Sequence, residues 1–169
     1  MPEVLTGTWY RMFDNAVPHQ MFSEMTAIPC LVEEILGISP DVPGHALDWS
    51  PRLPPDWPRV AVQRFPYGQE RMDFEVRQSS GLLAASIRTT GSQRISLRFS
   101  PALPMGSAVL SVMQDGKPLH YEVDDRGSHV HALVATSFSA ATEIEVRYRP
   151  GVALMPERLP LLEGDDSLN

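Results

Sequence analysis

Apolar and polar residues alternate along most of the chain that follows Pro58. A period of two is typical of strands that bury one face and expose the other. Eight such runs, separated by turn-forming residues, lie at 60–62, 72–76, 83–87, 95–99, 109–112, 119–123, 130–134 and 144–148. The dipeptide Asp115-Gly116 favours a type I′ hairpin after one of them. The pattern predicts a mainly β protein, built as an antiparallel β-sandwich.

Before Gly37 the apolar residues have helical spacing instead. Steps of four and three residues separate Met21, Met25, Ile28, Val32 and Ile35. Gly37 stands where a left-handed helix C-cap is expected, and Pro29 should kink or split the helix. The segment is apolar on its other faces too, so we expect a covering partner or self-association through this helix. Cys30 lies in the apolar stretch, which predicts a buried, unreactive thiol.

The segment between helix and strands is rich in proline. Six prolines fall within residues 38–58, at Pro40, Pro43, Pro51, Pro54, Pro55 and Pro58. We expect an ordered connector, with Trp49 and Trp57 anchoring it under the sandwich. The predicted organisation is a terminal loop and helix (1–37), a connector (38–58), a β-sandwich domain (59–150) and a tail (151–169).

Composition and charge exclude several classes of function. The 169-residue chain carries 14 Lys and Arg against 21 Asp and Glu, a net charge of −7, which argues against nucleic-acid partners. It has no apolar run of about 18 residues, so we expect no membrane span. The start does not resemble an export signal, which favours a cytoplasmic location. No phosphate loop or nucleophile elbow is present, and we expect no cofactor.

Few residues stand out as candidates for chemistry from their spacing. Glu3 lies in a turn-rich stretch and by position is most simply a solvated carboxylate. Trp9 and Tyr10 could stack on a sugar ring, or pack a helix onto a neighbouring element. His129 and His131 are two residues apart and share one strand face. Two histidines do not make a metal site without further ligands, so no metal is expected.

Three stretches together resemble a known family. Residues 2–7 (PEVLTG), 16–23 (AVPHQMFS) and 31–37 (LVEEILG) are similar to the end of the catalytic (α/α)6 barrel in amylo-α-1,6-glucosidase-like, six-hairpin glycosidases of the glycogen-debranching type. Residues 47–57 resemble the junction after that barrel, which in bacterial members leads into a β-sandwich. The resemblance implies one or two terminal barrel helices before the sandwich. Phe22 departs from the family, which often has Trp there.

The resemblance also implies roles for residues near the N-terminus. Glu3 would be the general base that activates water, while Trp9, Tyr10, His19 and Gln20 would lie near the sugar. Inverting hydrolysis needs a second carboxyl about 6.5–9.5 Å away, and the helices that would carry this general acid lie upstream of residue 1 in the family.

We therefore expect a C-terminal part of a glycoside hydrolase acting on α-1,6-type glucosidic linkages of an oligosaccharide or glycogen-like substrate. It would be inactive without the upstream barrel, so whether the chain is itself an enzyme stays open. The alternative is a non-catalytic carbohydrate-binding or interaction β-sandwich. A third possibility is a truncated product with no independent role.

Overall fold

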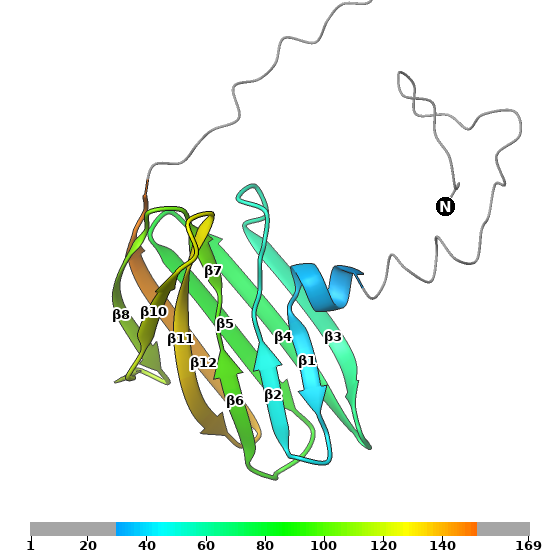
Figure 1. The fold of residues 1–169 in the computed structure, drawn as a ribbon. Helices are drawn as coiled ribbons and strands as arrows, with labels where there is room; N and C mark the ends of the chain where they lie inside the picture. The colour runs from blue at the N-terminus through cyan, green and yellow to red at the C-terminus, as the bar shows by residue number, and fades with distance from the viewer. Residues whose placement is uncertain (1–29, 152–169) are drawn as a thin grey trace, which may run out of the picture.

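A computed structural model describes residues 30–151, which form two packed β-sheets (Figure 1). The first sheet has the order β1-β2-β6-β11-β10, and β7 also pairs with β11. Its strands are β1 (Ile38–Asp41), β2 (Ala46–Trp49), β6 (Ile95–Phe99), β7 (Ala102–Pro104), β10 (Glu122–Asp125) and β11 (His129–Phe138). The predicted mainly β sandwich is confirmed.

The second sheet lies behind the first in Figure 1 and has the order β3-β4-β5-β12-β8-β9. Its strands are β3 (Arg59–Tyr67), β4 (Glu70–Ser79), β5 (Leu82–Thr89), β8 (Ala108–Gln114), β9 (Lys117–Pro118) and β12 (Ala141–Arg149). All its strand pairs are antiparallel. Asp115 and Gly116 have φ of 49° and 77° between β8 and β9, as the predicted type I′ turn requires.

The first sheet departs from the antiparallel prediction at one pair of strands. β2 and β6 run parallel, with Asp48 level with Arg98 and Trp49 level with Phe99. A parallel pair needs a long crossover connection. Here β3, β4 and β5 of the second sheet supply it, so the chain leaves the first sheet and returns to it.

The sandwich begins further upstream than the expected boundary at residue 59. Residues 38–49, assigned to a connector from the sequence, form β1 and β2 of the first sheet. Trp49 is only 2% exposed and meets Phe74 and Phe99 at ring-centroid distances of 5.2 and 5.3 Å. Its indole Nε1 donates to the Leu36 carbonyl at 3.1 Å, so Trp49 does anchor this segment. Trp57 is 37% exposed in a surface turn, and its predicted anchoring role is wrong.

A short helical turn precedes the first strand. The described part of the predicted helix is η1 (Cys30–Ile35), a π-type turn in which the Leu36 amide donates to the Leu31 carbonyl at 2.9 Å. Gly37 has φ +64°, which confirms the left-handed conformation expected there. Cys30 is exposed, so the predicted burial of its thiol is wrong. None of the six residues of η1 is buried. Barrel helices are not seen in the described part of the chain.

The core lies between the inner faces of the two sheets. It is built from aromatic and aliphatic side chains of both sheets, among them Leu47, Phe99, Met72, Ile87, Val130, Ala132, Ile144 and Val146. Alternation leaves every second residue of each strand on an outer face. Over residues 30–151, none of the helical segments has the length and apolarity needed to cross a bilayer.

Candidate functional site

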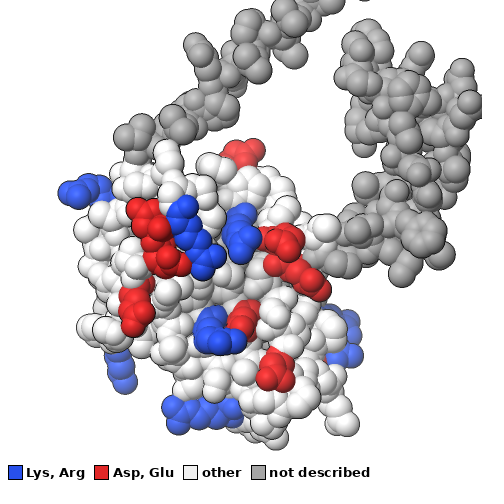
Figure 2. Space-filling model, in the orientation of Figure 1, with Lys and Arg blue, Asp and Glu red and all other residues white. Residues whose placement is uncertain are grey.

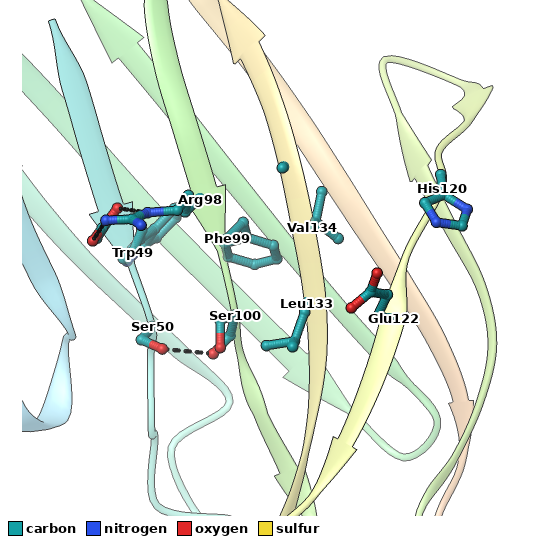
Figure 3. Close-up of a pocket in the computed structure, with 11 residues that line it drawn as sticks. Trp49, Ser50, Arg98, Phe99, Ser100, His120, Glu122, Leu133 and Val134 are labelled. Atoms are coloured by element: carbon teal, nitrogen blue, oxygen red, sulfur yellow. Dashed lines mark hydrogen bonds and ion pairs between the residues drawn. The ribbon is translucent and has the colours of Figure 1, made fainter.

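A groove of about 450 Å³ lies on the outer face of the first sheet (Figure 3). Strand register defines its geometry. Asp48 on β2 is level with Arg98 on β6, and Arg98 is level with Ala135 on β11. Leu133, two residues from Ala135 and on the same face, is level with Glu122 on β10. The groove therefore crosses four strands and has a small residue, Ala135, at its middle.

An ion pair forms one wall of the groove. Arg98 donates from Nε to Asp48 Oδ1 at 2.6 Å and from Nη2 to Asp48 Oδ2 at 2.5 Å. The hydrogen bond and the charge of Asp48 raise the pKa of Arg98 above its usual value. Such a two-point pair fixes the orientation of both side chains. Both carboxylate oxygens of Asp48 are engaged, so this group is not a free base.

The opposite wall comes from β10 and the segment before it. Glu122 and His120 both line the groove and are exposed, and Figure 3 shows them across β11 from Arg98. Within residues 30–151 the Glu122 carboxylate has no ion-pair partner. Figure 2 shows that acidic and basic side chains are interspersed over this face of the molecule. Glu122 is thus able to accept hydrogen bonds from a ligand.

The floor of the groove combines apolar and hydroxyl groups. Leu133 is half-buried and Ala135 is exposed, which gives a shallow apolar strip. Ser50 and Ser100 line its end, and Ser50 Oγ donates to the Ser100 carbonyl at 2.8 Å, the dashed contact in Figure 3. An apolar lining with a few fixed polar groups is the composition typical of ligand sites.

A pair of histidines lies next to this floor. The Nδ1 of His131 is 2.9 Å from the Ser100 carbonyl oxygen and 3.1 Å from Ser100 Oγ. The imidazole of His129 lies edge-to-face with that of His131, with centroids 4.6 Å apart, so the predicted shared face is confirmed. Burial is the main cause that lowers the pKa of His131. No cluster of three or more His, Cys, Asp or Glu side chains suited to a metal occurs in residues 30–151.

The residues that the family resemblance singled out lie elsewhere in the chain. Glu3, Trp9, Tyr10, His19 and Gln20 are outside the described residues 30–151. Their predicted roles in base catalysis and sugar binding therefore stay predictions. The expected tail at 151–169 is likewise outside, except for Gly151.

Sequence reasoning missed the residues that form the groove. The alternation in residues 95–99 does place Arg98 on an outer face. Its partner Asp48 could not be inferred, because the proline-rich segment gave no strand signal and the β2–β6 pairing is parallel. The alternation in residues 119–123 likewise puts His120 and Glu122 on one polar face. Their neighbours across the groove could not be inferred, because these are set by the pairing of β10 with β11.

Comparisons with known proteins add little to this picture. No family model matches the sequence, and no curated protein matches it. A solved structure with some similarity is alpha-L-fucosidase isoenzyme 2 from Paenibacillus thiaminolyticus, at 11% identity and a TM-score of 0.32. The match covers 53% of this chain and 15% of the fucosidase chain. A similarity this low does not indicate a shared function.

Proposed function

We propose that the β-sandwich is a non-catalytic carbohydrate-binding module that holds a saccharide in the groove on its first sheet. One observation carries the proposal: an apolar strip at Leu133 and Ala135 lies between the Asp48–Arg98 pair and Glu122. Sugar rings present hydroxyl groups at their edges and C–H groups on their faces. Carboxylates and a guanidinium match the hydroxyls, and the apolar strip matches the ring face.

The charge of the groove selects among saccharides. Asp48 and Glu122 contribute two negative charges to the lining and Arg98 one positive charge, so these carboxylates outnumber the guanidinium. The whole chain has a net charge of −7. Both favour neutral saccharides over uronic acids or sulfated sugars, since like charges repel.

The first experiment measures saccharide binding by calorimetry on the full chain. Neutral malto- and isomalto-oligosaccharides are titrated beside a glucuronate oligosaccharide, and binding of the neutral ones alone is expected. Ala135→Phe fills the middle of the groove and should weaken binding at least about tenfold, a loss of about 1.4 kcal/mol. Ala61→Phe is the matched control, because Ala61 is an exposed strand residue on the second sheet. Equal affinities of the two variants would contradict the groove assignment.

A second candidate places the chain in a glycoside hydrolase of the six-hairpin type acting on α-1,6-type linkages. It is supported by the resemblance of residues 2–37 to the end of that barrel and by a sandwich whose first strand starts directly after Gly37. In this proposal Glu3 activates water, and the general acid belongs to an upstream barrel that covers the N-terminal helix. Joining such a barrel to the chain should give α-1,6-glucosidase activity. A Glu3→Gln version that hydrolyses as fast as its parent would show that the role is wrong.

A further inference from the structure

The Ser100 carbonyl joins the groove to a buried histidine. It accepts the Ser50 hydroxyl from the groove side and lies 2.9 Å from His131 Nδ1 on the other. A carbonyl oxygen only accepts hydrogen bonds, so His131 carries its proton on Nδ1 and donates to Ser100. His131 is 1% exposed, and its position depends on this bond.

The other ring nitrogen of His131, Nε2, has no hydrogen-bond acceptor beside it among residues 30–151. In the neutral tautomer Nε2 is an acceptor, and it is buried without a hydrogen-bond partner among residues 30–151. Protonation of His131 would put an N–H there with no acceptor and a charge in a site closed to water. A buried unpaired charge destabilises the arrangement around it.

Burial is the largest cause that lowers the pKa of His131; the bond to the Ser100 carbonyl acts against it and raises the pKa, and the nearby cationic and imidazole groups lower it further. The imidazole of His129, on the same strand β11, packs edge-to-face against the His131 ring. Arg52, from the segment after β2, and Arg126, from the turn before β11, are positively charged neighbours. Asp124 is level with His131 on β10, but its carboxylate accepts from Arg126 Nε at 2.7 Å. The carboxylate level with His131 is thus already paired, and Glu122, the next residue on that face of β10, is level with Leu133 and exposed at the groove.

We propose that acid releases the saccharide by protonating His131, which displaces the imidazole together with the Ser100 carbonyl bonded to it and so shifts the Ser50–Ser100 floor of the groove. The release itself rests on the saccharide-binding function proposed above, whereas the coupling between His131 and the floor does not. Neutral His131 holds the Ser100 carbonyl in place; a charged one has to move towards water, and Ser100 moves with it. The groove then loses the hydroxyl end of its floor.

The test begins without any ligand, by nuclear magnetic resonance of the full chain between neutral pH and about pH 5, the range of histidine switches. The imidazole nitrogens of His131 and the amides of Ser50 and Ser100 should titrate with one midpoint. In His131→Asn, whose side-chain amide can still donate to the Ser100 carbonyl but does not titrate, the two serine amides should stay unchanged. His129→Asn removes a neighbour that lowers the pKa of His131, so the midpoint should move towards neutral pH.

Several outcomes would overturn the coupling. One is a titration of His131 that leaves Ser50 and Ser100 unmoved, and another is a serine titration that persists in His131→Asn. Loss of the β-sheet circular dichroism over the same pH range would show global unfolding instead of a local switch.

The binding arm uses maltotriose on the same proteins. Its affinity should fall at least about fivefold from neutral to acid pH in the parent and stay flat in His131→Asn. If maltotriose does not bind at neutral pH, the binding function has failed and the resonance data still decide the coupling. A parent affinity independent of pH would overturn the release.

Discussion

The outer faces of the two sheets use their side chains in opposite ways. On the second sheet, long charged residues neutralise one another across strands: Glu75 accepts from Arg59 at 3.0 Å and lies 3.4 Å from Arg77, which in turn lies 2.9 Å from Glu143. On the first sheet the Asp48–Arg98 pair stands at one side of the groove, and small residues such as Ala135 leave the groove open. The groove of the first sheet therefore comes from short side chains that lie between polar side chains of fixed orientation.

The two sheets also differ in what holds them in place. The second consists mainly of long antiparallel strands that hydrogen-bond to consecutive neighbours. The first depends on β2, a four-residue strand whose last residue, Trp49, reaches the core. Because the groove lies on the first sheet, changes that loosen β2 should damage both stability and binding.

The largest expected effect comes from Trp49→Ala. The indole packs against Phe74 of the second sheet and Phe99 of the first, so its loss leaves a cavity where the sheets meet. Truncating a buried aromatic of this kind costs about 3–5 kcal/mol, measurable by denaturant unfolding. Trp57→Ala is the control, since Trp57 is partly exposed, and should change stability by about 0.5 kcal/mol or less. Similar losses in both variants would mean that Trp49 does not join the sheets.

A smaller but still clear loss is expected for Gly37→Ala. Gly37 has φ +64°, and a Cβ there would overlap the backbone carbonyl of Ser50. The left-handed conformation alone costs a non-glycine residue about 1–2 kcal/mol, and the overlap adds to it. Gly127→Ala separates the two causes, because Gly127 has φ +79° with open space around its Cβ position. Unfolding experiments should show the larger loss for Gly37→Ala; equal losses would show that the overlap relaxes freely.

Trp49 and Gly37 also show which features of the fold could be predicted from the sequence. The alternation after Pro58 predicted eight strands, and seven of the regions lie within strands whose apolar residues pack on the core. The run at 119–123 overlaps β10 only at 122–123, and Val123 is 52% exposed. Gly37 was predicted as a left-handed residue from local chemistry alone. By contrast, β1, β2 and β7 have three or four residues each, too few for a period to be read. The Asp48–Arg98 wall depends on a parallel pairing across 50 residues, which no local pattern encodes.

The pH dependence of stability should also distinguish the two sheets, because the buried His131 lies on β11 of the first sheet. Burial lowers the pKa of His131 in the folded chain, so the unfolded chain binds a proton first as the pH falls. Stability should therefore be full above the ordinary histidine pKa of about 6.5 and decline as the pH falls below it. Thermal unfolding at a series of pH values measures the decline, which should be reduced in His131→Asn. A His131→Asn profile that declines like the parent would assign the loss to other groups.

The smallest effect is expected from Glu75→Gln on the face of the second sheet. The hydrogen bond from Arg59 lowers the pKa of Glu75, so any stability it adds is present above the ordinary carboxylate pKa and is lost as the pH falls through the folded value. The pair is exposed to solvent and screened by salt, so the shift in melting temperature should be slight and vanish at high salt. Saccharide binding should be unchanged in this variant.

Asp48→Asn is the counterpart of Glu75→Gln on the first sheet. It removes the charge that orients Arg98 through a two-point pair, so it should weaken saccharide binding while costing as little stability as Glu75→Gln. The paired measurement is a melting curve and a saccharide titration on each variant. If Glu75→Gln lowered the affinity as much as Asp48→Asn, the affinity would depend on overall charge, and the functional distinction between the two faces would be lost.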